Sequence, residues 1–182
     1  MPATRPSHLL TLQTLQSFSD ISRFLREGVA DEDSRQLHDS LGALSQQIDE
    51  AVRARRTSTD TADIMRRVGT LLHAAQEHQR LLTGLGSAWH ALYEFGAYQR
   101  ALRALCHAIA LWRHQLQGRS PQESAAFDQF ELLAWRTLGE ALLLIDMYAH
   151  QSHHASDFHE AQPPRSVSAL QRARAWWRRW RR

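Results

Sequence analysis

Apolar residues recur every three or four positions through the first half of the chain, which is the spacing of amphipathic helices. The first predicted helix ends near Gly28, and the acidic residues 31–33 favour the start of a second helix. A polar stretch at residues 56–60 separates the second predicted helix from a third, which stops or bends near Gly84 and Gly86. The apolar positions of these three helices are Leu9, Leu12, Leu15, Phe18, Ile21, Leu25 and Val29; Leu37, Leu41, Leu44, Ile48 and Val52; and Ile64, Val68, Leu71, Leu72, Ala75, Leu82 and Leu85.

Aromatic residues become more frequent in the second half of the chain. A short helix is predicted from Ser87 to Phe95, and Gly96 is expected to break it. A longer helix is predicted over residues 97–117, with Gly118 closing it.

The four residues 120–123 predict the start of the next helix. Ser120 suits the cap, Pro121 suits the first helical position, and Glu123 completes a capping box. This helix is expected to break or bend at the polar residues 151–154, and a proline pair ends the folded body.

No window of four or more residues alternates apolar and polar positions beside β-branched enrichment, so no strand is predicted. The expected fold class is all-α, with antiparallel helical hairpins or a bundle of six to seven helices. Residues 1–84 would form an N-terminal helical bundle region, residues 85–164 further helical hairpins, and residues 165–182 a basic tail. A chain of 182 residues buries roughly 70 % of its unfolded surface and needs no staple; Cys106, its only cysteine, has no disulfide partner in the chain.

Charge is distributed unevenly along the chain. All 22 basic residues are arginine, which we take as the mark of a GC-rich bacterial genome. Residues 165–182 hold seven arginines and no acidic residue, so residues 1–164 hold the other 15 arginines and all 19 acidic residues. The body is therefore mildly acidic, and the net charge of +3 comes from the tail.

The tail combines an apolar stripe with a cluster of arginines. A helix of this kind can bind an anionic membrane interface, or bind nucleic acid through ion pairs and stacking. It can also dock on an acidic protein surface, or pack its tryptophans on the body of the protein. The sequence leaves these alternatives open. The anchoring residues would be Arg172, Arg174, Trp176, Trp177, Arg178, Arg179, Trp180, Arg181 and Arg182.

Two windows in the C-terminal half resemble the tetratricopeptide repeat. In residues 85–113 the match lies in the second helix of the repeat, at Gly96, Tyr98, Ala101, Leu102, Leu105, Ala108 and Ile109. In residues 135–163 it lies at Trp135, Leu138, Gly139, Tyr148 and Pro163, while Asp146 stands where the family has its turn glycine.

The resemblance implies a scaffold of helical hairpins whose groove holds an extended or helical peptide, without catalysis. Small bacterial members of this family include the cytoplasmic chaperones of type III secretion, with which the size and acidic body are compatible. On this interpretation the groove would be lined near His90, Glu94, Trp135 and Arg136. A generic helical bundle fits the same apolar spacing and stays the alternative.

Histidine is frequent, with 11 residues, but its spacing does not define a metal site. His73 and Glu77, and likewise His150 and His154, stand four residues apart on one helical face. The Glu-x-x-His pairs of a di-iron bundle are missing, so no metal or other cofactor is expected; the cluster at residues 150–159 remains a place for adventitious metal.

Cys106 lies beside His107, but neighbours on a helix point in different directions, so no thiolate pair is expected. There is no Gly-rich phosphate loop, Gly-x-Ser-x-Gly or Cys-x-x-Cys motif. The chain is therefore not expected to be an enzyme.

These observations favour a protein-binding adaptor or chaperone with a helical groove and a cationic tail. A nucleic-acid-binding subunit and a peripheral membrane protein, both acting through residues 165–182, are the alternatives. A cytoplasmic location is expected because no apolar stretch near the start has the length of a secretory signal. The partner's identity and homo-oligomerisation stay open.

Overall fold

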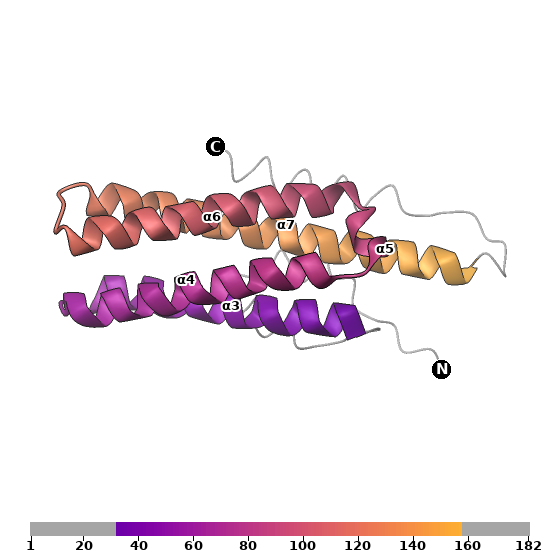
Figure 1. The fold of residues 1–182 in the computed structure, drawn as a ribbon, viewed down its shortest axis with the longest axis horizontal. Helices are drawn as coiled ribbons and strands as arrows, with labels where there is room; N and C mark the ends of the chain where they lie inside the picture. Colours follow the sequence, from indigo (N-terminus) through magenta and orange to yellow (C-terminus); the bar gives the residue numbers. More distant parts are fainter. Residues whose placement is uncertain (1–31, 158–182) are drawn as a thin grey trace.

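The computed structural model describes residues 32–157, which form five helices (Figure 1). These are α3 (Glu32–Thr57), α4 (Thr61–Gly84), α5 (Ser87–His90), α6 (Tyr93–Gln117) and α7 (Glu123–Asp157). No strand occurs in this part of the chain, so the all-α prediction is confirmed. The expected total of six to seven helices is not confirmed, because the first predicted helix and the tail lie outside the described residues.

The four long helices form an antiparallel bundle. Figure 1 shows the α3–α4 hairpin alongside the α6–α7 hairpin, with the short α5 at the end where the hairpins are joined. Close packing links α3 with α4, α4 with α6 and α6 with α7, whereas α3 and α7 approach each other much less. The largest side chains that are almost completely buried are Trp89, Trp112, Tyr98, Phe130, Leu37, Leu41, Leu44, Ile48, Leu71, Leu82 and Leu102.

The predicted break at residues 56–60 is confirmed, and polar side chains define it. The Asp60 carboxylate accepts a hydrogen bond from the Ala62 amide at 2.9 Å and so caps α4. The Ser58 hydroxyl accepts one from the Asp60 amide at 3.0 Å. At the other end of the hairpin, the Gly86 amide donates to the Asp33 carboxylate at 2.8 Å, which ties the α4–α5 connection to the start of α3.

The expected break at Gly96 is wrong, because α6 already begins at Tyr93. The chain turns at Ala91 and Leu92 instead, and Leu92 is extended there with φ −77° and ψ 133°. Leu92 and Trp89 are both buried, so their insertion into the core fixes this turn. Gly96 occupies the first turn of α6, where only the Arg100 guanidinium lies near its missing side chain.

The tetratricopeptide-like arrangement is not confirmed. The first window contains only the four-residue α5 and most of α6, and residues 135–157 of the second belong to one helix. Helix α7 passes through Asp146 and through residues 151–154 without ending, so the expected break there is wrong. The physical reason is that no proline interrupts residues 123–157 and the only glycine, Gly139, lies in mid-helix.

The connection between α6 and α7 follows the prediction only in part. Gly118 does close α6, but the left-handed residue after it is Arg119, with φ 47°. The Ser120 hydroxyl accepts a hydrogen bond from the Gln122 amide at 3.1 Å, as a cap should. The capping box is wrong, since the Glu123 carboxylate binds residues of other helices instead (see below).

Within residues 32–157, no helix combines the length and the apolar character needed to cross a membrane.

The position of Gly96 gives a direct test of the helix boundary. Gly96→Ala is expected to stabilise the protein by about 0.5–1 kcal/mol, because alanine is the better helix former and the added Cβ would meet only the Arg100 guanidinium, at an ordinary contact distance of 3.5 Å. Gly69→Ala, in the middle of α4, is the matched control and should give a similar gain. Urea unfolding measures the stability of both variants. If only Gly96→Ala lost stability, the chain would turn at Gly96 and not at Leu92.

Candidate partner-binding cleft

A buried histidine joins three helices in the core. One ring nitrogen of His78, Nδ1, lies 2.7 Å from the Ser40 hydroxyl of α3, and the other, Nε2, lies 2.5 Å from the Tyr98 hydroxyl of α6. His78 and Tyr98 are completely buried. A neutral imidazole has one donor and one acceptor nitrogen, so both of its polar atoms are satisfied here.

Burial determines the protonation of this group. It lowers the pKa of His78 from 6.5 to about 4 and raises the pKa of Tyr98, so both side chains are neutral at pH 7. Sequence reasoning missed this network. The available signal was the phase of His78, which falls three residues after Ala75 and four before Leu82 on the apolar face of its helix.

A cleft of about 140 Å³ opens between α4 and α6, and its Leu82 and Leu102 follow His78 and Tyr98 by one helical turn. Leu82 and Leu102 are buried and form its apolar floor. Its rim is polar, with Gln79 next to His78 and Gln99 next to Tyr98 in the sequence. The full lining is Gln79, Leu82, Thr83, Gln99, Leu102 and Arg103. Its floor and rim therefore offer one apolar contact and several hydrogen-bonding groups to a ligand.

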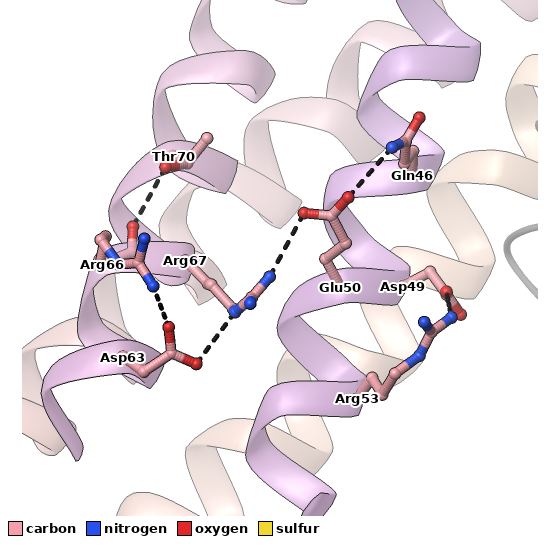
Figure 2. A network of polar contacts seen from close by, with 8 residues as sticks. All are labelled: Gln46, Asp49, Glu50, Arg53, Asp63, Arg66, Arg67 and Thr70. Atoms are coloured by element: carbon pink, nitrogen blue, oxygen red, sulfur yellow. Dashed lines mark hydrogen bonds and ion pairs between the residues drawn. The ribbon is translucent and has the colours of Figure 1, made fainter. Parts of the chain in front are cut away.

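The arginines of α3 and α4 are neutralised by neighbouring carboxylates. In Figure 2, the Arg67 guanidinium bridges Asp63 of its own helix at 3.1 Å and Glu50 of α3 at 3.5 Å. The same view shows Arg53 paired with Asp49 and Arg66 paired with Asp63. All seven arginines in these two helices make ion pairs: Arg35, Arg53, Arg55, Arg56, Arg66, Arg67 and Arg80.

The arginines of α6 differ, since Arg100, Arg103 and Arg113 are exposed and pair with no carboxylate in the described part of the chain. Glu94 is the only acidic residue of that helix. Arg103 is also part of the cleft lining. The cleft is therefore bordered by positive charge that no described carboxylate neutralises, which favours an anionic ligand.

The four residues predicted to line a groove come from two places: His90 and Glu94 lie where α5 meets α6, whereas Trp135 and Arg136 lie in α7. The His90 ring contacts the Phe95 ring, with 4.4 Å between centroids, whereas Trp135 packs partly buried against the core and Arg136 is exposed. Thr137 donates a hydrogen bond to the Ala101 carbonyl at 3.2 Å, which sets the level of α7 against α6. From this level, Glu94 and Trp135 are separated by roughly 13 Å along the helix axes. The structure thus places His90 and Glu94 at one level of the bundle and Trp135 and Arg136 at another, and the groove stays a prediction.

A second polar cluster fixes the opposite end of the bundle. The Glu123 carboxylate accepts hydrogen bonds from the Arg55 guanidinium at 2.7 and 2.6 Å and from the Trp112 indole at 2.7 Å. Arg55 lies over the Phe127 ring, 5.7 Å from its centroid. The hydrogen bond with Arg55 lowers the pKa of Glu123 and raises the pKa of Arg55, so the pair stays charged. This cluster joins α3, α6 and α7 and has a structural role.

The described residues contain no group of three or more His, Cys, Asp and Glu side chains that could hold a metal ion. His73 is exposed, and Glu77 pairs with Arg80. Burial raises the pKa of Cys106, whose thiol lies 3.9 Å from the Gln79 side-chain oxygen. A thiol with a raised pKa is a poor nucleophile. Of the residues named as a place for adventitious metal, 150–159, all after Gln151 lie outside the residues whose side chains the structure describes, as does the tail anchor at residues 172–182.

Comparison with protein families, curated proteins and solved structures finds no match to this chain.

The His78 network predicts a dependence of stability on pH. The folded pKa of about 4 lies below the unfolded value of 6.5, so the folded state binds fewer protons. Its contribution is fully present above pH 6.5 and is lost as the pH falls towards 4. We expect a loss of about 3 kcal/mol in the free energy of unfolding over this range. Denaturant titration at several pH values measures this loss. If the free energy of unfolding of His78→Gln fell by the same amount over this pH range, the loss would not come from His78.

The Glu123 cluster predicts an asymmetry between two ion pairs that join the same helices. Glu123→Ala should cost about 2–4 kcal/mol, because it leaves the part-buried Arg55 and the buried Trp112 indole without their acceptor. Glu131→Ala removes the partner of Arg56, which is 59 % exposed, and should cost less than about 1 kcal/mol. Thermal or denaturant unfolding measures both variants. Equal losses of stability in Glu123→Ala and Glu131→Ala would show that the Glu123 cluster stabilises the bundle no more than an exposed ion pair does.

Proposed function

We propose that this chain is a non-enzymatic, protein-binding adaptor or chaperone, and that the cleft between α4 and α6 receives a segment of its partner. The observation that carries this proposal is the combination of a leucine floor with a rim of amides and an arginine that has no described carboxylate partner. Such a mixture of one apolar pocket and a few oriented polar groups is typical of peptide recognition.

The partner segment that fits this cleft is acidic and amphipathic. An aliphatic side chain would contact Leu82 and Leu102, while Gln79 and Gln99 hydrogen-bond to polar groups beside it. A carboxylate would bind Arg103, because the guanidinium fork matches carboxylate geometry in a bidentate pair. The α6 arginines that have no carboxylate partner among residues 32–157 would also speed the encounter with an acidic partner.

The absence of an enzymatic role is part of the proposal and has its own support. Ser40, His78 and Tyr98 are the residue types of a nucleophilic relay, but His78 is completely buried and its two ring nitrogens are already engaged. A substrate would have to separate the helices to reach the imidazole. Stabilisation of the bundle is the role that this burial favours.

A site-specific crosslink tests the proposed cleft. A photoreactive amino acid replaces Gln99 in the full chain, and the matched control replaces Gln129, which is exposed on α7. We expect the probe at 99, but not at 129, to form an adduct with an acidic segment of one protein in the native host. Arg103→Glu should lower the yield at least tenfold.

Three outcomes would contradict the adaptor. Equal adducts at positions 99 and 129 would show that the cleft has no selectivity. An adduct with a second copy of the chain would make the cleft a self-association site. Nucleic acid captured at 99, or captured only by a chain that retains residues 165–182, would favour the nucleic-acid-binding alternative. A loss of that capture with rising salt would identify phosphate contacts.

A further inference from the structure

One flank of α3 is buried although no described helix packs closely along it. Ser40 and Glu50 contact α4, and Arg56 contacts α7. With about 100° between successive residues, a row of four residues lies on the Arg56 side of the helix, away from α4. These four are Ser34, His38, Gly42 and Ser45, all of them buried and all in polar or ring contact with other groups.

Helix α7 does not account for this burial. It approaches α3 much less than the other neighbouring helices approach one another. The ion pairs Arg55–Glu123 and Arg56–Glu131 join the two helices at one end, where α3 finishes and α7 begins. Towards the other end, Asp146 of α7 is 8 % exposed and also engaged with other groups. Among the described helices, none packs closely enough to account for the burial between α3 and α7.

We propose that residues 9–29 form an amphipathic helix that covers this flank of α3. It would add a fifth long helix to the bundle of α3, α4, α6 and α7. The connection supports this occupant. Only residues 30 and 31 separate the last apolar position of the predicted helix from Glu32, where α3 begins. Helices joined by so short a connection pack as antiparallel neighbours. Since α4 already occupies the other flank, the α7 side is the place left beside α3.

The dimensions and the chemistry of the segment agree with this placement. Residues 9–29 span about 31 Å as a helix, and the flank from Ser34 to Arg56 spans about 33 Å. The apolar residues from Leu15 to Val29 lie within about 120° of one another around the helix. This face would be buried against the flank, while Gln16 and Asp20 lie on the opposite side. The surface is thus an internal interface of the chain and is separate from the proposed partner cleft.

An internal crosslink tests the proposal in the full chain. Benzoylphenylalanine replaces Phe18, on the apolar face, and in the control it replaces Gln16, on the opposite face of the same predicted helix. At position 18 we expect adducts within residues 34–45 or 135–146 of the same chain, at a yield at least tenfold above the control. Adducts with α4 or α6, adducts that join two isotopically distinct chains, or equal yields at both positions would overturn the proposal.

Thiol labelling provides a second measurement that separates local uncovering from unfolding. Cys106→Ala removes the only cysteine, and Ser45→Cys then reports on the flank, while Ala51→Cys reports on the core. Phe18→Asp should accelerate labelling at position 45 at least tenfold and leave position 51 unchanged, whereas Gln16→Asp should affect neither. An unchanged rate at 45, or the same acceleration at 51, would contradict a covering segment.

Discussion

A neutral imidazole in the core is the constraint on which the arrangement of α3, α4 and α6 depends. His78 of α4 has a hydroxyl partner on each of the two neighbouring helices, Ser40 and Tyr98. Leucine contacts allow small changes of register between helices, but two short hydrogen bonds to one rigid ring do not. The ring therefore fixes α4 and α6 relative to each other, and the cleft beside Gln79 and Gln99 inherits that fixed geometry.

Charge is used differently in the two hairpins. In α3 and α4 every arginine has a carboxylate partner, so this hairpin presents a largely neutralised surface. The arginines of α6 have no such partner among the described residues. Exposed ion pairs contribute little stability, so the pairing matters chiefly for what the surface attracts. Of these α6 arginines, Arg103 lines the cleft, so its charge acts on whatever binds there.

The helical fold could be predicted because apolar spacing and polar breaks are local signals. The burial of Leu37, Leu41, Leu44 and Ile48 follows their spacing, and the break at residues 56–60 follows from its capping side chains. The predicted break at Gly96 was wrong because glycine permits a turn without requiring one. The turn lies at Leu92, where burial of the side chain decides the backbone, and such tertiary effects leave no mark in a local pattern.

The site was harder to predict because it is made by pairing across helices. Glu123 carries a sequence signature of capping, yet its carboxylate binds Arg55, 68 residues away, and the indole of Trp112. The cleft depends on which faces of α4 and α6 meet. Periodicity defines an apolar face on each helix but not the order of the helices around the bundle.

The contact between Arg55 and Glu123 also bears on how the chain folds. Most helix packing joins elements adjacent in the sequence, so each hairpin encloses only a short loop, whereas the α3–α7 ion pair closes a loop of 68 residues. Local contacts carry a small entropic cost of closure and form quickly. The two hairpins are thus expected to form before the α3–α7 ion pair, which joins the first described helix to the last.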